Sequence, residues 1–307
     1  MNIALRQLNV FVTVAQELTI TAAAEKLFLS KPAVSMALSE LEKQLGHKLF
    51  DRNNNRLIIN EQGKRLLPLA DELLARSQDI EQLFSQEGPI TGKLKIGSSD
   101  TVGNQVTPFL LRDFRESSGH RDQSLYIANT AQICHMLAEF ELDIGLVEGK
   151  VQEGNLAVQP WLSDEMVIAC HPDHPLATLP HLRLQDLENS QWILREPGSG
   201  TREFFLQKLA PRLAHWQQAF ELNNTEAIIN CTAANLGITC LSRRAVEHAV
   251  KDQRVVILSA PLDMHRQYWL LYHKEKYQSP LLKLFIAFCQ QWQDTVSCPD
   301  ETSDPKQ

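Results

Sequence analysis

Residues 29–46 read LSKPAVSMALSELEKQLG, and this stretch decides the N-terminal fold. Ser30 predicts a helix N-cap, and Pro32 suits the first turn, where the N–H that proline lacks would have no helical partner. Apolar residues then recur at three- and four-residue steps and predict one buried stripe: Val34, Leu38, Leu41 and Leu45. The opposite side begins with short or basic residues, which lets it approach another surface closely: Lys31, Ala33, Ser35 and Met36.

Shorter elements flank this helix. Apolar residues at helical spacing predict a helix over residues 3–17, and Thr19 and Thr21 open a second, short helix. After Gly46, two strand-like runs enclose three asparagines at 53–55, a residue type that tolerates the left-handed backbone of a turn. Three helices followed by a β-hairpin predict a winged helix-turn-helix over residues 1–60.

A long helix follows this module. Leu66, Leu73 and Ile80 stand seven residues apart in the helix predicted for 61–86, and Phe84 lies near its end. This near-heptad spacing favours pairing with a second helix over packing on its own domain, because GPITG at 88–92 leaves no compact partner close in the chain. We therefore assign residues 61–90 to a linker and dimerisation helix.

From Lys93 onward, predicted strands alternate with predicted helices. Repeated βα units favour parallel sheets with helices on both faces, and the length suits two lobes with a cleft between them. We assign residues 91–163 with 265–296 to one lobe and 164–264 to the other, so that the two form one domain over 91–296. The polar tail at 297–307 is predicted to be disordered.

Composition limits the classes of protein to consider. Hydrophobic residues at 43% and charged residues at 22% are globular values, and no run of apolar residues is long enough to predict a transmembrane helix. The start, MNIALRQLNVF, lacks a small-residue cleavage site, so we expect no secretory signal and a cytoplasmic protein. The first 65 residues hold nine Lys or Arg and six Asp or Glu, so their charge of +3 leaves −10 for the other 242 residues. A mildly basic module on an acidic body suits local contact with phosphate.

Motifs for catalysis and metal binding are weak. Gly-Ser-Gly at 198–200 is not a GxSxG elbow, and the chain has no GxxxxGK[ST] loop and no HExxH pair, so we expect no enzyme and no metal. Six cysteines without a CxxC pair predict buried thiols. The sharpest metal alternative is the run Cys170-His171-Pro172-Asp173-His174. A solute-binding protein for transport, another alternative, would need an export signal.

The N-terminal pattern resembles that of the LysR-type transcriptional regulators. Ala-Ala-x-x-Leu, then Ser-x-Pro-Ala-Val-Ser, then Leu-Glu-x-x-Leu-Gly-x-x-Leu-Phe-x-Arg appear in order at 23–52. The resemblance implies an α/β chain with a winged helix-turn-helix, a long linker helix and a two-lobed, periplasmic-binding-protein-like (type 2) effector domain. It also implies promoter DNA, a small-molecule effector and a second copy of the chain as partners, in a homodimer or a dimer of dimers (a homotetramer). RNA polymerase is a further candidate partner, and no membrane is expected.

The quoted helix is then expected to lie in a major groove, with its first residues at base edges and phosphates. Lys31 stands where the family commonly has Gln, and Met36 where a polar or basic residue is frequent, so the target base sequence stays open. Arg52 and Arg56 flank the asparagine turn and could reach the backbone or minor groove, although Arg52 could instead pair only with Asp51. The DNA-contact candidates are Thr21, Ser30, Lys31, Pro32, Ala33, Ser35, Met36, Ser39, Arg52 and Arg56.

Two hydroxyl-rich segments follow predicted strands, one in each lobe. SSDTVGN at 98–104 and WILREPGSGTRE at 192–203 resemble segments of the sulfite-responsive YeiE-type branch of the family. Ligands of open α/β sheets bind beyond the carboxyl ends of the strands, so we expect the two segments to face each other and hold an oxyanion such as sulfite or sulfate. Three alternatives stay open: an organic-acid or amino-acid effector, hydroxyls that only cap helices, and a DNA-binding protein without ligand control.

Two residues outside these segments complete the predicted cleft. Glu148 ends the strand-like run DIGLVEG and is expected to point toward the cleft, either to contact the ligand or to pair with Arg195 or Arg202 as a gate. Trp161 could pack on the pocket wall or serve equally well as an ordinary core aromatic. We expect no cofactor apart from the effector. The ligand-binding candidates are Ser98, Ser99, Thr101, Glu148, Trp161, Arg195, Gly198, Ser199, Gly200, Thr201, Arg202 and Glu226.

Overall fold

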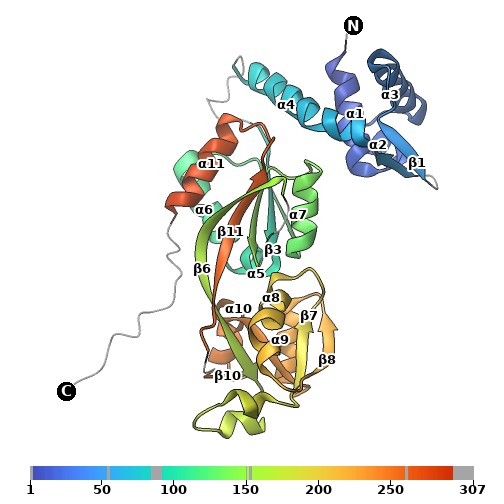
Figure 1. Ribbon diagram of the computed structural model, residues 1–307. Coiled ribbons are helices and arrows are strands. Elements are labelled where there is room, and N and C mark those ends of the chain that lie inside the picture. The colour runs from blue at the N-terminus through green and yellow to red at the C-terminus, as the bar shows by residue number, and fades with distance from the viewer. Residues whose placement is uncertain are drawn as a thin grey trace.

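The computed structural model describes residues 3–53, 56–83, 92–149, 151, 154–259 and 262–292. It has an N-terminal module, a long helix and two α/β lobes joined by strands that run through both (Figure 1). The predicted fold class is confirmed. The predicted tail at 297–307, Phe84 and the end of the predicted linker at residue 90 lie outside the described residues.

The N-terminal module is a winged helix-turn-helix. Ser30 accepts a hydrogen bond from the Ala33 N–H at 3.3 Å and so caps the third helix, while Gly46 ends it with a left-handed φ of 72°. The predicted stripe of this helix is buried at Val34, Leu38 and Leu41. The elements are α1 (Leu5–Glu17), α2 (Ile20–Lys26), α3 (Lys31–Leu45), β1 (Phe50–Asn53) and β2 (Arg56–Ile59).

The long helix α4 (Glu61–Leu83) has two apolar faces. The side chain of Asn60 accepts hydrogen bonds at its start, and Leu67 and Ala70 are buried against the winged-helix core. On the other face Leu73 and Ile80 are 51% and 59% exposed. The predicted seam is therefore open to solvent at those two positions, as a pairing surface requires.

Within the described residues, nine strands form one mixed sheet in the order β4-β3-β5-β11-β6-β9-β7-β8, with β10 beside β6. Lobe I holds the parallel strands β3, β4 and β5, and lobe II holds the parallel strands β7, β8 and β9. The prediction of parallel sheets missed the antiparallel pair β6 and β11 that passes from one lobe to the other. The bounds are β3 (Leu94–Ser99), β4 (Gln123–Ala128), β5 (Ile144–Glu148), β6 (Leu156–Cys170), β7 (Gln191–Arg195), β8 (Gln217–Leu222), β9 (Ile238–Ser242), β10 (Val256–Leu258) and β11 (His265–His273).

Helices cover both faces of this sheet and close separate apolar clusters in each lobe. Phe114 and Phe285 pack edge to face in lobe I, and Trp192 lies against Phe205 in lobe II. The helices are α5 (Asp100–Gln105), α6 (Thr107–Ser118), α7 (Thr130–Ala138), α8 (Gly200–Phe204), α9 (Thr225–Ala233), α10 (Arg243–Lys251) and α11 (Pro280–Gln291). Over the described part of the chain, no helix combines the length and apolarity that a membrane crossing needs.

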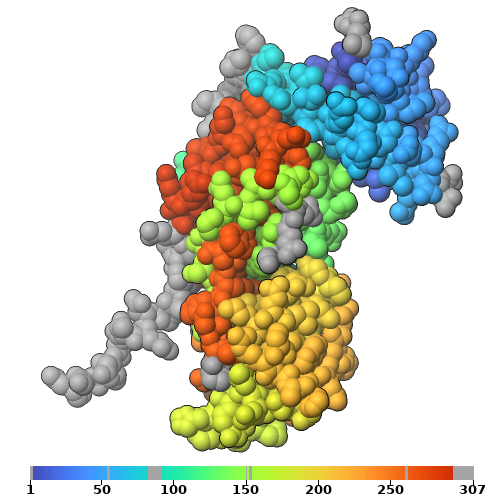
Figure 2. All heavy atoms as spheres, viewed as in Figure 1, coloured from blue at the N-terminus to red at the C-terminus, as the bar shows by residue number. Residues whose placement is uncertain are grey.

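The winged helix-turn-helix module and α4 touch lobe I directly, as the space-filling view shows (Figure 2). Phe140, which follows α7 with a left-handed φ of 58°, is buried in the winged-helix core, and Gln16 donates to its carbonyl oxygen. The Lys276 Nζ lies 3.0 Å from carboxylate oxygens of both Asp71 on α4 and Asp143 in lobe I. Burial lowers the pKa of Lys276, but the two carboxylates outweigh it and raise that pKa overall. The contact is thus held by one buried aromatic ring and one buried cation.

Candidate functional site: recognition helix and effector cleft

The exposed face of α3 carries the predicted DNA contacts. Lys31, Ser35 and Ser39 are exposed along it, and Met36 is 62% exposed. Ala33 is half-buried, whereas the remaining members of the predicted set are exposed on α2, α3 or the hairpin: Thr21, Ser30, Pro32, Arg52 and Arg56. The surface can therefore approach a DNA groove without rearrangement of the module.

Sequence reasoning missed Phe28, which precedes this helix. Its side chain is 95% exposed, and its φ of 54° places the backbone in the left-handed region. A large exposed aromatic ring at the start of a recognition helix is suited to apolar contact with a thymine methyl group or a sugar. The sequence signal was an apolar residue at the corner where the chain must turn before Ser30.

The lobe I side of the cleft is formed by the end of β3 and the start of α5. Ser99 occupies the N-cap position of α5, yet its hydroxyl makes no capping bond and instead contacts the Glu148 carboxylate. Glu148 is 1% exposed and its backbone N–H donates to Ser99 Oγ at 3.2 Å. Ser98 faces the lobe interior, because its hydroxyl donates to the Leu146 carbonyl oxygen at 3.1 Å. Of the two serines, only Ser99 adjoins the carboxylate of the predicted cleft.

The lobe II side repeats this arrangement. Ser199 occupies the N-cap position of α8, is 1% exposed, and makes no side-chain capping bond. Its hydroxyl has no hydrogen-bond partner among the described residues. A buried polar group without a protein partner is rare in a native fold, and such a hydroxyl is free to bond to a ligand. The alternative in which the serines only cap their helices is therefore wrong for both Ser99 and Ser199.

The lobes are closed on each other at glycines. A Cβ added to Gly200 would lie 2.3 Å from the Glu148 carbonyl oxygen, and one added to Gly149 would lie 2.6 Å from the Gly200 Cα. Gly198 adopts a left-handed φ of 89°, and its carbonyl oxygen accepts a hydrogen bond from the Ala131 N–H at 3.1 Å. Glycine is required here because two backbones from different lobes meet with no room for a side chain.

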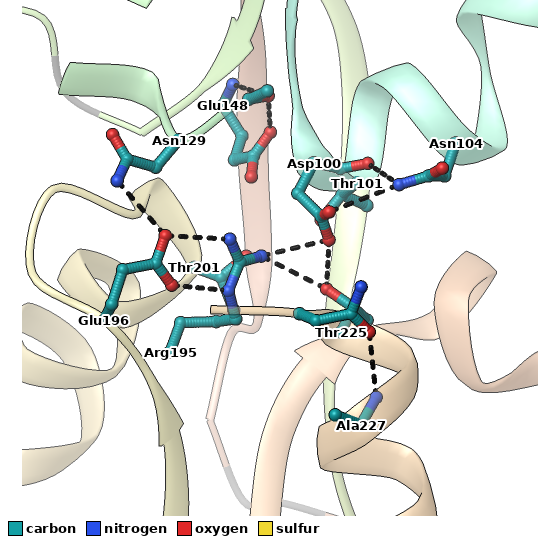
Figure 3. A network of polar contacts seen from close by, with 12 residues as sticks. Asp100, Thr101, Asn104, Asn129, Glu148, Arg195, Glu196, Thr201, Thr225 and Ala227 are labelled. Carbon is teal, nitrogen blue, oxygen red and sulfur yellow. Dashed lines mark hydrogen bonds and ion pairs between the residues drawn. The ribbon is translucent and has the colours of Figure 1, made fainter. Parts of the chain in front are cut away.

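An ion-pair network joins the lobes beside this contact (Figure 3). Arg195, 2% exposed, donates to Asp100 of lobe I at 3.0 Å, to Glu196 at 2.8 and 3.0 Å, and to Thr225 at 3.1 Å. Asn129 of lobe I donates to Glu196 at 3.1 Å. Burial raises the pKa of the Glu196 carboxyl, but the bonds from Arg195 and Asn129 outweigh it and lower that pKa overall. The network therefore holds the two lobes together through bonds between their own side chains, and we call the Arg195 part of it the Arg195 latch.

This network overturns the predicted gate. Arg195 is engaged by Asp100 and Glu196, and Arg202 donates to the Arg195 carbonyl oxygen at 2.7 Å and lies 3.3 Å from Glu221. Among the described contacts neither guanidinium pairs with Glu148, so the expected ion pair of Glu148 with Arg195 or Arg202 is wrong. The reason is that each arginine is already paired with other acids, Arg195 with Asp100 and Glu196, and Arg202 with Glu221.

Two further candidates lie away from the cleft. The Trp161 indole N–H donates to the Cys289 carbonyl oxygen at 2.8 Å, and its ring stacks on Trp292 with centroids 6.1 Å apart, so it packs beneath α11. Glu226 is exposed at the start of α9 and lies 3.9 Å from Arg254. On that helix the preceding residue, Thr225, faces the cleft network instead.

The predicted metal alternative also lacks its geometry. The Cys170 thiol is buried, which raises its pKa to about 11, and the Nδ1 atoms of His171 and His174 accept backbone hydrogen bonds in their own turns. Across the part of the chain that the structure describes, no group of three His, Cys, Asp or Glu residues could hold a metal ion.

The most important residue missed from sequence is Arg266. It is buried on β11, directly opposite Asp164 on β6, and its Nε donates to the Asp164 carboxylate at 2.7 Å. Its Nη1 donates to Thr201 Oγ1 at 3.0 Å and its Nη2 to Thr101 Oγ1 at 3.5 Å. One guanidinium therefore reaches the hydroxyls that begin α5 and α8. The only sequence signal was a charged residue alternating with apolar ones in HRQYWLLYH, and register with Asp164 cannot be read from that pattern.

A winged helix-turn-helix joined by a long helix to a two-lobed α/β domain is the architecture of a class of bacterial transcriptional regulators. Residues 5–64 match the bacterial regulatory helix-turn-helix of the lysR family, and residues 87–294 match the LysR substrate binding domain. The chain belongs to the LysR family of transcriptional regulators.

Relatives and solved structures agree with this assignment. The chain is 38% identical to the HTH-type transcriptional regulator YeiE of Escherichia coli K12, over 94% of this chain and 98% of that one. It is 28% identical to the HTH-type transcriptional regulator CysL of Bacillus subtilis, over 90% and 98% of the two chains. A full-length OxyR variant from Pseudomonas aeruginosa has the same fold, with a TM-score of 0.74, 21% identity and coverage of 95% and 96%.

Proposed function

We propose that this LysR-family regulator binds promoter DNA through α3 and that a small inorganic oxyanion in the cleft, sulfite in its hydrogen-bearing form, controls that binding. The observation that carries the proposal is the unpartnered hydroxyl of Ser199, which is buried at the lobe contact beside Gly200 and Thr201. Its counterpart on lobe I, Ser99, also leaves its helix uncapped but donates its hydrogen to the Glu148 carboxylate, so the donor on that side is the Thr101 hydroxyl. Hydroxyl donors from two lobes suit a ligand whose oxygens accept from several directions.

Enclosure favours a small ligand over an organic acid. The side chains proposed to meet the ligand are buried, which favours a ligand small enough to fit among them: Ser99, Thr101, Glu148, Ser199 and Thr201. The helices behind them, α5 and α8, have only six and five residues, so short side-chain donors must supply most of the attraction. An organic-acid or amino-acid effector would need the lobes to open, against the Arg195 latch.

Glu148 favours a ligand that carries a hydrogen. Arg266 is balanced by Asp164, so the Glu148 carboxylate is the charge that an incoming anion meets. A carboxylate only accepts hydrogen bonds, and two unscreened negative groups repel strongly in a buried site. Part of a sulfite population keeps a proton at neutral pH, whereas sulfate has none. We infer a preference for sulfite over sulfate.

The DNA-binding arm of the proposal rests on exposed residues. α3 presents Lys31, Ser35 and Met36, and α4 presents Leu73 and Ile80 for pairing with a second copy of the chain. We infer a homodimer or dimer of dimers acting in the cytoplasm on two promoter half-sites, with RNA polymerase as a candidate partner at the promoter. The cleft has a binding role and no catalytic one.

Calorimetric titration of the full chain with sulfite, sulfate, thiosulfate and glycerol tests the ligand. Saturable heat with sulfite, weakened more than tenfold in Ser199→Ala and Thr101→Val, is the expected result. Thr178→Val, which removes the same hydroxyl from an exposed position in lobe II, is the matched control and should bind as the wild type. Glu148→Gln should reduce the difference between the Kd for sulfite and the Kd for sulfate. No saturable heat with any of the three oxyanions would refute the ligand proposal.

A second experiment tests control of DNA binding. The full chain selects its own duplex from random sequences, and fluorescence anisotropy then measures the affinity with and without sulfite. We expect sulfite to change the affinity in the wild type but not in Ser199→Ala. Equal affinities in both conditions would leave a DNA-binding protein without ligand control.

A further inference from the structure

Arg266 occupies a fixed point between the lobes. It lies on β11 and pairs with Asp164 on β6, and these are the two antiparallel strands that run through both lobes. The Asp164 carboxylate also accepts a hydrogen bond from the Ser242 hydroxyl at 2.8 Å. Burial lowers the pKa of Arg266, but Asp164 outweighs it and raises that pKa overall, so the group is a permanent cation.

The bonds from Arg266 fix the direction of two hydroxyl hydrogens. A guanidinium only donates, so the Oγ1 atoms of Thr101 and Thr201 must accept from it. Each threonine hydroxyl has one hydrogen left, and within the described residues neither hydroxyl donates to a protein acceptor. Both hydrogens are therefore available to a ligand, one from each lobe.

We propose that Arg266 is a positioning residue that keeps the hydroxyl hydrogens of Thr101 and Thr201 turned away from itself and toward the cleft, so that the site favours ligands that present acceptor atoms to both lobes. This rests on the proposed oxyanion function and adds a specificity determinant to it. Because Arg266 stays paired with Asp164 on the connecting strands, it holds the hydroxyls of Thr101 and Thr201 in fixed positions relative to each other when the lobes meet. A group that carries only hydrogen-bond donors, such as an ammonium group, is disfavoured at these positions, since it would face the two hydroxyl hydrogens.

A double-mutant cycle on the full chain tests whether Arg266 acts through the two threonines. Arg266→Lys keeps the charge beside Asp164 but cannot span both hydroxyls, and Thr101→Val/Thr201→Val removes the hydroxyls at nearly constant shape. Calorimetric Kd values for sulfite are measured for the wild type, each of these two variants, and the triple variant. We expect a loss of at least tenfold in each of the two and no more than twofold further loss in the triple variant, because coupled residues are not additive.

Additive losses, or a wild-type Kd in Arg266→Lys, would overturn the inference, since a merely structural arginine would weaken binding whether or not the threonines were present. If Arg266→Lys unfolds, the uncharged pair Asp164→Asn/Arg266→Gln replaces it in the same cycle, with the same two outcomes. Absence of sulfite, sulfate and thiosulfate binding in the wild type would refute the proposed function and this inference together. If the wild type binds sulfite but the losses of the variants add, the inference about Arg266 is refuted and the proposed function stands.

Discussion

Replacing Gly200 by alanine should hold the lobes apart and abolish tight effector binding. The added Cβ would lie 2.3 Å from the Glu148 carbonyl oxygen and 2.9 Å from its Cγ, whereas ordinary contact begins at 3.4 Å. To remove this overlap, α8 must move about 1 Å away from the end of β5. That movement breaks the 3.1 Å bonds from Ala131 N to Gly198 O and from Asn129 Nδ2 to Glu196 Oε1.

These two bonds set a lower limit on the effect, because the Arg195–Asp100 bond between the same lobes lengthens as well. Each contributes about 1 kcal/mol in net terms. Their loss therefore costs about 2 kcal/mol, which corresponds to roughly a thirtyfold weaker Kd for a ligand that binds only the closed lobes. Calorimetry with sulfite on the full chain measures the Kd, and thermal unfolding measures the stability.

Gly154→Ala is the matched control, because a Cβ there meets open space. It should leave both the Kd and the unfolding midpoint unchanged. A Gly200→Ala protein that binds sulfite within twofold of the wild type, with the same midpoint, would refute the reasoning that this close backbone approach exists when ligand is bound.

Four other outcomes follow from the structure. Lys276→Met removes the cation that two half-buried carboxylates share and should lower the free energy of unfolding by about 3 kcal/mol in urea titrations; an unchanged midpoint would contradict the importance of this ion pair. Leu73→Glu places a charge in the exposed stripe of α4 and should shift sedimentation toward smaller species, whereas an unchanged distribution would exclude this stripe from the interface. Burial lowers the pKa of His273 below its ordinary 6.5, so its contribution to stability is present above pH 6.5 and is lost as the pH falls toward the folded-state pKa. His273→Gln should therefore make the free energy of unfolding depend less on pH below 6.5. A pH dependence parallel to that of the wild type would argue against this role of His273. Lys31→Ala should weaken DNA binding equally across sequences and reduce the salt slope by about one, and a change confined to particular sequences would show a base contact instead.

The N-terminal module was predictable because local signals agree with one another. Ser30, Gly46 and the apolar stripe of α3 each specify the same helix, and their spacing does not depend on distant residues. The linker was predicted in part. Leu73 and Ile80 form an exposed stripe, but no local pattern indicated that a neighbouring stripe with Leu67 and Ala70 packs on the winged helix.

The cleft was predictable only where it follows strand ends. The segments at 98–104 and 192–203 meet because the parallel strands of each lobe end at the lobe contact, with β3 and β7 running toward it in opposite directions. The structure brings Thr101 and Thr201 to one guanidinium. That guanidinium belongs to Arg266, 65 residues beyond Thr201 in the chain, and its partner Asp164 is set by antiparallel register. Register depends on tertiary pairing, which a single sequence does not reveal. Trp161 was misplaced for the same reason, because the sequence does not show which face of β6 its side chain lies on until the strand order is known.

Two rigid elements connect the cleft with the DNA-binding module. α7 begins beside Thr130, whose hydroxyl donates to the Glu148 carbonyl oxygen at 2.8 Å, and Phe140 lies just beyond its end in the winged-helix core. β5 ends at Glu148 and begins next to Asp143, which holds Lys276. A ligand that shifts Glu148 therefore acts on both ends of the contact with the DNA-binding module, because a packed helix and a central strand move as units. Linkage makes the effect mutual, so DNA that prefers one position of the module must change the affinity of the cleft by the same factor.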